Sequence, residues 1–199
     1  GFYAFNVLGW REGNSVRIVY WSPVVTIIAD ILIWAVFHLS IGYWCAHIPV
    51  ERFDYNHWSY QTFKWEQGGE IYQKLFKVKN WKRFIPSGAA LYQGAYQIKH
   101  VAEFTVEGVK LWLKESCRSE FCHRMMILPG FLFFLWNEAV VGWIMVAYAV
   151  LNNLIPIIMQ RYNRPRIRKL LARLEEIERK KTMELRIYEP QKAFSHSYE

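Results

Sequence analysis

The chain has 199 residues, a net charge of +8 and 18% aromatic residues, including 10 Trp. Excess positive charge can indicate nucleic-acid binding, but here the bases flank long apolar runs, so we expect membrane lipids and no nucleic acid as partners. Trp and Tyr favour the membrane–water interface, which makes an aromatic-rich soluble core the weaker alternative. The three cysteines form no CxxC pair and are interpreted as small buried hydrophobes.

The first predicted element is a membrane-spanning helix over residues 22–49. Residues 1–21 precede it as a mixed, aromatic segment that we expect outside the cytoplasm. Ser22 is a suitable helix cap, and Pro23 suits the first helical position. The apolar run that follows contains one acid, Asp30, which we expect to pair with Arg124 or with an asparagine.

Residues 50–118 are rich in Lys and Arg and are predicted to be a cytoplasmic, interfacial segment. Apolar residues recur at helical spacing in Ile71–Val78 and again in Phe104–Leu113. Between them, Trp81–Gly88 interleaves aromatic rings with bases, as an interfacial helix requires. A solvated linker is the alternative for this stretch.

A transmembrane hairpin is predicted over residues 119–159. Its first arm, Phe121–Trp136, contains Pro129 and Gly130, which should kink it. Its second arm, Val140–Met159, is about 20 residues long, enough to cross a hydrocarbon core of roughly 30 Å. Only three residues separate the arms, so we expect them to be antiparallel.

The tail, residues 160–199, begins with four arginines, and moving each of these charges into the bilayer centre costs several kcal/mol. Further on, Leu170, Leu171, Leu174 and Ile177 share one face of a predicted amphipathic helix. By the positive-inside rule, the middle segment and the C-terminus are cytoplasmic. The sequence therefore predicts an all-α integral membrane protein with about three transmembrane helices, multi-pass in the inner membrane.

The best catalytic candidates from spacing are Glu120 and His123, which lie three residues apart on one helical face. A carboxylate beside an imidazole can orient it and raise its basicity. The alternative is that the pair only positions a helix at the interface. His38 lies two turns after Asp30, and Asn153 is expected to bond a neighbouring helix. No second acid–histidine pair is present, so no metal site is expected.

Three motifs occur in an order that resembles a known family. They are Trp81-Lys82 followed by Pro86, then Glu120-x-x-His123, then Gln160–Arg166 with the sequence QRYNRPR. Their order and intervals are similar to those of the glycosyl-4,4'-diaponeurosporenoate acyltransferase family of staphyloxanthin-type carotenoid biosynthesis. The resemblance covers roughly residues 66–171, and QRYNRPR is its most specific part.

The resemblance implies transfer of a fatty acyl group to a sugar hydroxyl of a membrane-embedded carotenoid glycoside or similar lipid. It requires no cofactor; acyl-CoA or a similar acyl donor would be a substrate. The motif positions expected to carry the reaction are Glu120, His123, Arg161, Asn163, Arg164 and Arg166. In this interpretation His123 removes the hydroxyl proton, Glu120 orients His123, and the arginines hold the donor's phosphates.

Two alternatives stay open from the sequence. The chain can be a non-catalytic transmembrane subunit of a larger, pigment-bearing complex such as a photosynthetic one, since its aromatic N-terminal segment and long tail offer surface to other subunits. It can also be an acyltransferase that modifies a lipid other than a carotenoid.

Overall fold

The computed structural model describes residues 17–85, 101 and 104–195, and every regular element in these ranges is helical. The predicted all-α class is confirmed for this part of the chain. Most of the segment predicted outside the cytoplasm, residues 1–21, lies outside the described residues, as do Pro86 and the last four residues of the tail.

Helix α1, Pro23–His47, begins where the sequence predicts, with Ser22 in an extended conformation and Pro23 opening the helix. Most of its apolar side chains face outward; Val24, Ile31 and Val36 are each more than 60% exposed. Such a surface is costly in water, because burying one such side chain is worth about 1.5–3 kcal/mol. The outward apolar surface therefore indicates association with a membrane.

Helix α4, Val106–Ile127, is capped by Thr105, whose hydroxyl accepts a hydrogen bond from the Gly108 amide at 3.0 Å. At Leu128 it passes into the 3-10 helix η6, Leu128–Leu135, with Pro129 near its start. The change of helix type falls where the sequence predicts a kink. Proline has no amide hydrogen, so the hydrogen-bond pattern of an α-helix cannot continue through Pro129.

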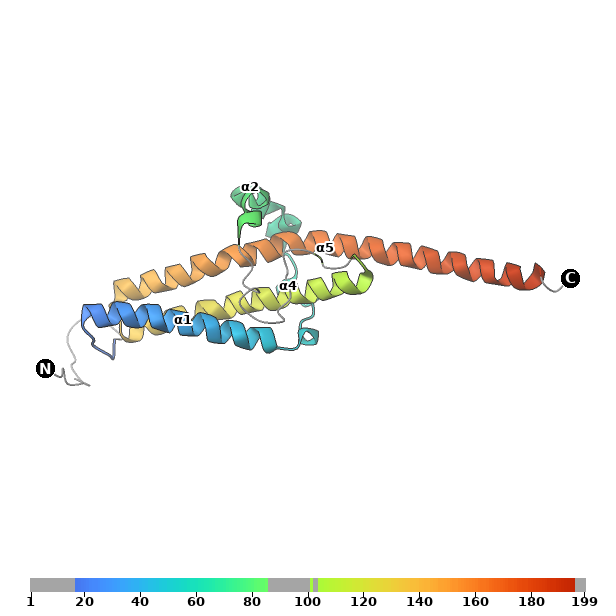
Figure 1. The fold of residues 1–199 in the computed structure, drawn as a ribbon. Coiled ribbons are helices and arrows are strands. Elements are labelled where there is room, and N and C mark those ends of the chain that lie inside the picture. Colours follow the sequence, from blue (N-terminus) through green and yellow to red (C-terminus); the bar gives the residue numbers. More distant parts are fainter. Residues whose placement is uncertain (1–16, 86–100, 102–103, 196–199) are drawn as a thin grey trace.

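Helix α5 runs without interruption over Ala139–Ser195, 57 residues, and its second half projects beyond the other helices (Figure 1). It begins four residues after η6 ends, so the predicted antiparallel hairpin is present. Among the described residues, two helices are long and apolar enough to cross a membrane, namely α1 and the stretch of α5 over Ala139–Arg186. The third predicted span, Phe121–Trp136, is not confirmed, because it divides between the end of α4 and η6.

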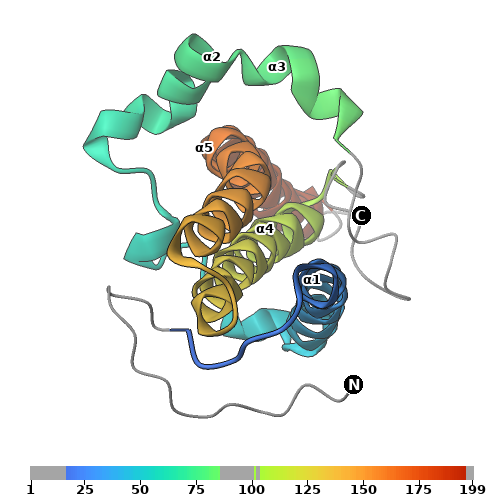
Figure 2. The same ribbon diagram turned by 90° about the vertical axis from the view of Figure 1, so that its left-hand side faces the viewer.

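The three long elements lie side by side, as the view along the bundle shows (Figure 2). Near the start of α1, the indole of Trp34 stacks on Phe133 with ring centroids 4.6 Å apart. Asp30 is buried beside them and accepts hydrogen bonds from the side chains of Trp136 at 2.7 Å and Asn137 at 2.9 Å. The predicted pairing of Asp30 with an asparagine is confirmed.

At the other end of the bundle, α4 packs on α5 through a second core. Leu113 and Val109 are fully buried there against Leu171. The amphipathic tail predicted from the leucines is helical, and its apolar face is used as far as Leu174, while Ile177 is 61% exposed.

The segment between α1 and α4 forms an arch of short helices across α5 (Figure 2). Tyr72 and Val78 from this arch are buried against Ile158 and Tyr162 of α5. The outer surface of the arch exposes apolar and aromatic side chains, namely Trp58, Trp65, Leu75 and Phe84. Such side chains suit a membrane interface, and the interfacial location of the arch stays a prediction. The helices of the arch are η1 Val50–Arg52, η2 Trp58–Tyr60, η3 Lys64–Gly69, α2 Glu70–Phe76, α3 Val78–Trp81 and η4 Lys82–Phe84.

Candidate active site

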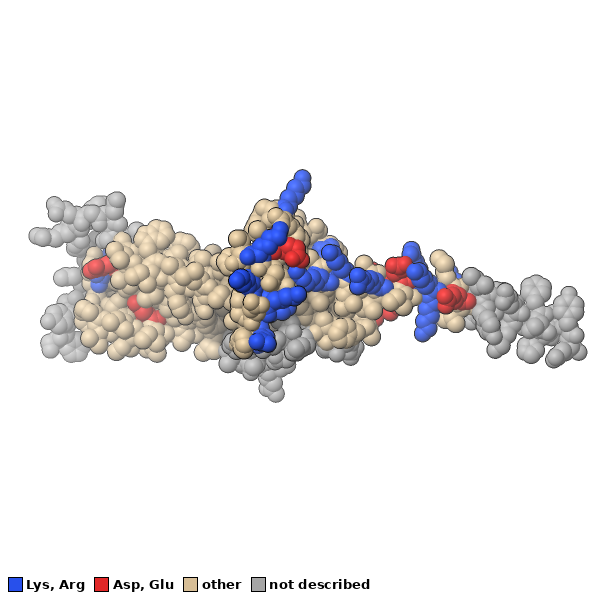
Figure 3. Space-filling view, turned by 90° about the horizontal axis from the view of Figure 1, so that it is seen from above, with Lys and Arg blue, Asp and Glu red and all other residues tan. Residues whose placement is uncertain are grey.

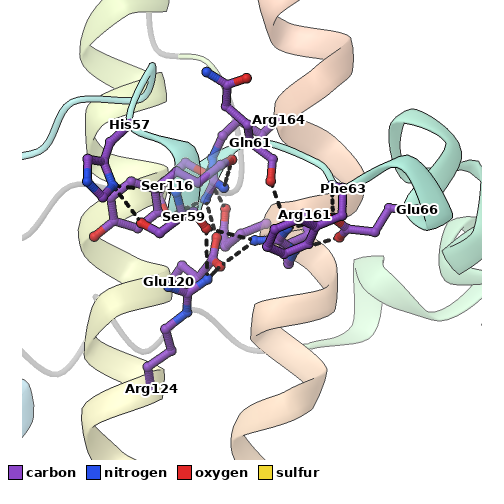
Figure 4. Close-up of polar contacts among 12 residues, drawn as sticks. His57, Ser59, Gln61, Phe63, Glu66, Ser116, Glu120, Arg124, Arg161 and Arg164 are labelled. Carbon is purple, nitrogen blue, oxygen red and sulfur yellow. Dashed lines mark hydrogen bonds and ion pairs between the residues drawn. The ribbon is translucent and has the colours of Figure 1, made fainter.

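A buried network of charges joins the arch, α4 and α5 directly after the apolar part of α5 (Figure 4). Its centre is Arg161. The Nε and Nη2 atoms of this guanidinium donate to the two carboxylate oxygens of Glu66, both at 2.6 Å. Its Nη1 atom lies 3.0 Å from Glu120 Oε1. Backbone carbonyls of Ser59 at 3.1 Å and Gln61 at 2.8 Å take the remaining donors. All five N–H groups of Arg161 are therefore engaged by the protein.

Glu120 gathers two further arginines. Arg164 Nη2 lies 2.7 Å from Glu120 Oε2 and also contacts the Ser116 carbonyl at 3.1 Å. Arg124, one turn along α4, binds Glu120 Oε1 and the carbonyl of Ser59. Arg161 and Arg164 are only 5% and 2% exposed. In this geometry they cross-link the fold and present little surface to a phosphate.

Three guanidiniums face two carboxylates in this network, so its fixed charge is positive. Burial raises the pKa of the Glu66 carboxyl, but hydrogen bonds from Arg161 and Tyr72 outweigh that effect and hold the pKa below its usual value. Buried charges of this kind are retained only when every partner is present, since an unpaired one costs several kcal/mol. The network thus fixes how the arch sits on the bundle.

Gly69 allows the arch to approach α5 closely. Its φ is +89°, and a Cβ there would lie 3.0 Å from the Arg161 carbonyl oxygen. That carbonyl lacks its usual helical donor, because the residue four positions later is Pro165. A glycine with left-handed backbone therefore lies against a carbonyl of α5 that has no helical hydrogen bond.

His123 is held by α5 and not by its neighbour on α4. Its Nδ1 lies 2.9 Å from Asn153 Oδ1, while Asn153 Nδ2 donates to the Ala149 carbonyl at 2.9 Å. The carbonyl fixes the orientation of the amide, so His123 donates through Nδ1 and carries its lone pair on Nε2. The expected contact between Glu120 and His123 is replaced by these partners, because the arginines of α5 claim the carboxylate.

A cavity of about 450 Å³, largely open at the surface, lies between α1 and α5, and His123 itself is not part of its lining. From α1 it is lined by Ile31, Trp34, Ala35 and His38, and from α5 by Met145, Tyr148 and Asn152. His38 Nδ1 lies 2.8 Å from the Trp34 carbonyl, which can only accept, so His38 also carries its lone pair on Nε2 when neutral. The apolar lining of the cavity ends at a polar edge formed by His38 and Asn152. Asn152 is adjacent in sequence to Asn153, the partner of His123.

The remaining predicted residues, Asn163 and Arg166, lie on the surface of α5 beneath the arch. Asn163 Oδ1 accepts from Lys82 Nζ at 2.9 Å, and Arg166 Nη2 lies 2.7 Å from Glu70. Both cations also lie against the ring of Tyr162. Burial, together with the charges of Arg166 and Lys79, lowers the pKa of the Lys82 ammonium.

Basic side chains gather around the arch and continue along α5 (Figure 3). In their middle, the pair formed by Lys82 and Arg166 is a suitable place for an anion.

Sequence reasoning missed two members of the site. Glu66 lies 95 residues from Arg161, and no local spacing connects them. Asn153 was expected only to bond a neighbouring helix, and its partner is the candidate base. The Glu120–Arg124 pair was detectable, since acids and bases four residues apart on a helix commonly pair.

Comparison with known proteins places these residues in a family. Residues 56–173 match the family described as glycosyl-4,4'-diaponeurosporenoate acyltransferase. A protein of that name from Staphylococcus aureus strain MRSA252 is 33% identical over 144 residues, covering 71% of this chain and 86% of the relative. The chain belongs to this acyltransferase family.

Further relatives from this family agree with that assignment. Proteins of the same name from S. aureus strains USA300 and NCTC 8325 / PS 47 are each 32% identical over 144 residues, with the same coverage of both chains. No solved structure matches the chain. The family match includes Glu66, Glu120, His123 and the arginines of QRYNRPR, and it leaves out α1. These relatives give no support to a photosynthetic role or to a place in a larger complex.

Proposed function

We propose that this chain is a membrane-embedded acyltransferase that transfers a fatty acyl group to a sugar hydroxyl of a carotenoid glycoside or similar lipid. The supporting observations are its family and one geometric feature, a histidine at the end of the apolar region with its Nδ1 held by a buried amide. The carotenoid part of the proposal comes from the names of the relatives.

His123 is the proposed general base. With Nδ1–H donated to Asn153, its Nε2 lone pair is available to a hydroxyl. An asparagine can take the orienting role that an aspartate has in other acyl-transfer sites. Glu120 then acts indirectly as a positioning residue. Its ion pairs with Arg161 and Arg164 fix the packing of α4 on α5 and so the position of His123.

The chemical step follows from these roles. His123 takes the proton of the sugar hydroxyl while the oxygen attacks the carbonyl carbon of an acyl thioester such as acyl-CoA. The tetrahedral intermediate collapses, the C–S bond breaks, and the thiolate takes the proton back from the imidazolium. An ester and a free thiol are formed, and the histidine returns to its starting state.

The donor's anionic group is assigned to the basic surface beneath the arch. Arg166 and Lys82 lie at that surface, where the pair of Arg166 with Glu70 is open to solvent, while Arg161 and Arg164 are buried against carboxylates and carbonyls. Asn163 positions Lys82. Of the expected anion-binding residues, Arg166 and Asn163 thus belong to the binding surface, and Arg161 and Arg164 support it from below.

The same arrangement sets the proposed topology. The protein is multi-pass in the inner membrane, with the arch and the C-terminus cytoplasmic and the turn at Glu138 on the opposite side. In this orientation a soluble donor reaches the basic surface from the cytoplasm, while a lipid-linked acceptor reaches His123 from the bilayer.

The deciding experiment measures ester formation by mass spectrometry, using the purified protein in lipid nanodiscs with acyl-CoA and a carotenoid glycoside. Replacing His123 with Ala should lower turnover by about 10²–10⁴-fold. His47→Ala, at the exposed end of α1, is the matched control and should keep full activity.

Unchanged turnover in H123A would remove His123 from the mechanism. An inactive wild-type protein that co-purifies in fixed stoichiometry with a large complex would favour the subunit alternative. Ester formation on another hydroxyl lipid, with none on the carotenoid glycoside, would redirect the acceptor.

A further inference from the structure

Three distinct environments lie along one face of α5. Met145 lies in the apolar cavity, Asn152 at its polar edge, and Asn163 beneath the arch. Steps of seven and eleven residues are close to two and three whole turns, so these side chains point in nearly the same direction. At 1.5 Å per residue they are separated by about 10 Å and about 16 Å along the axis.

The order of these environments matches the order of groups in an amphiphilic acyl donor. The cationic groups of Lys82 and Arg166 lie at one end of this face of α5. Asn152, the sequence neighbour of Asn153, lies in the middle, and the apolar cavity lies at the other end. A single molecule could therefore follow this face.

We propose that the cavity between α1 and α5 holds the acyl chain of the donor. This rests on the proposed function, since it places the chain so that the thioester lies near Asn152 and His123 and the anionic group reaches Lys82. The cavity is then a specificity-determining site, because the side chains that line it contact the chain that is transferred.

The lining of the cavity is suited to an apolar chain. Trp34 and Met145 meet across it, with the indole N–H 3.3 Å from the Met145 sulfur. Trp34 lies one turn from His38, and Ile31 about two turns, so the lined length is about 10 Å. Ala35 is the smallest of the lining residues. Apolar walls with a few polar groups at one end are typical of ligand cavities.

The test uses photoaffinity labelling with acyl-CoA that carries a diazirine near the end of its chain. Labelled peptides from protein in nanodiscs are mapped by mass spectrometry. We expect labels within Ile31–His38 and Met145–Asn152. Ala35→Phe should fill the cavity and lower this labelling at least about tenfold, which corresponds to about 1.4 kcal/mol.

Val36→Phe is the matched control, since Val36 is the next residue of α1, is 63% exposed and does not line the cavity. It should label as the wild type does. H123A should also label normally, because it removes the base and leaves the chain site.

Equal labelling of A35F and V36F, or labels confined to other faces, would overturn the inference. So would labelling that excess phospholipid removes and excess unlabelled acyl-CoA does not, since the cavity would then hold a bulk lipid chain. Normal labelling of the cavity without ester formation would support the chain site and count against the proposed reaction.

Discussion

Nδ1 of His123 lies 2.9 Å from Oδ1 of Asn153, so an amide of α5 orients the candidate base across a helix–helix contact. Asn153 is itself 1% exposed and tied to the Ala149 carbonyl. The position of the imidazole therefore depends on how α4 packs against α5. Anything that shifts this packing should alter the proposed reaction before it unfolds the protein.

Replacing Asn153 tests this dependence. N153A should lower kcat by about tenfold to a hundredfold, as loss of a partner that orients a histidine does in metal sites. N153D should move the acidic limb of the pH–rate profile to higher pH, because a carboxylate favours the imidazolium and raises the pKa of His123. A purely structural role would leave the pH profile of N153D in place.

Glu66 should be essential for stability. E66Q removes the charge of one partner of a buried pair, and the buried guanidinium of Arg161 that loses this carboxylate should cost about 3–5 kcal/mol in the free energy of unfolding. Thermal unfolding in detergent measures the difference. Glu175→Gln is the control, since its pair with Lys110 is exposed and should contribute nothing measurable.

The effect of Glu66 should also depend on pH. Because its pKa in the folded protein is below the ordinary value of 4.5, its stabilisation is complete above 4.5 and is lost as the pH falls through the lowered pKa. The melting curves of E66Q and the wild type should converge under strongly acidic conditions. A gap that stays constant down to the lowest pH at which both proteins remain folded would contradict this account.

Two adjacent glycines provide an internal comparison. Gly68 and Gly69 both have positive φ, so an alanine at either position pays about 1–2 kcal/mol for the left-handed backbone. Only at Gly69 would the new Cβ also press on the backbone of α5; nothing lies within 4 Å at Gly68. G69A should therefore unfold at a lower temperature than G68A. Equal melting temperatures would show that the arch can shift without cost.

Arg166 should affect donor binding and not folding. R166Q removes a partly exposed cation from the proposed anion site and should weaken acyl-CoA binding about tenfold, the effect of one charge-assisted hydrogen bond. Arg173→Gln removes the same charge two turns further along α5 and should bind as the wild type does. Titration in nanodiscs at two salt concentrations checks this, and equal affinities of the two variants would place the anion elsewhere.

Much of the fold was predictable because its determinants are local. Ser22 and Pro23 mark the start of α1, and the three residues between η6 and α5 give the hairpin. Proline at position 129 marks the change of helix type. The span predicted over Phe121–Trp136 was less certain, because its uncharged part is short for a membrane-spanning helix. In the structure this stretch divides between α4 and η6.

The site was less predictable, because its key contacts join distant segments. Glu120 was correctly singled out, but spacing within one helix could not show that Arg161 and Arg164 outcompete His123 for it. A guanidinium carries full charge and five donors, so it claims a buried carboxylate more strongly than a neutral imidazole does. Glu66 could not be predicted as a member of the site for the same reason, because its partner Arg161 lies on α5.

The network around Glu120 has one more consequence, for water. A transferase must prevent hydrolysis of its activated donor, and Glu120 lies three residues before His123, on the side of α4 toward the arch and the tail. Three guanidiniums, two carboxylates and carbonyls of the arch lie there, and most of their donors and acceptors are already paired with one another. These paired charges would keep water, the commonest competing nucleophile, away from the donor while the lipid-facing side stays open.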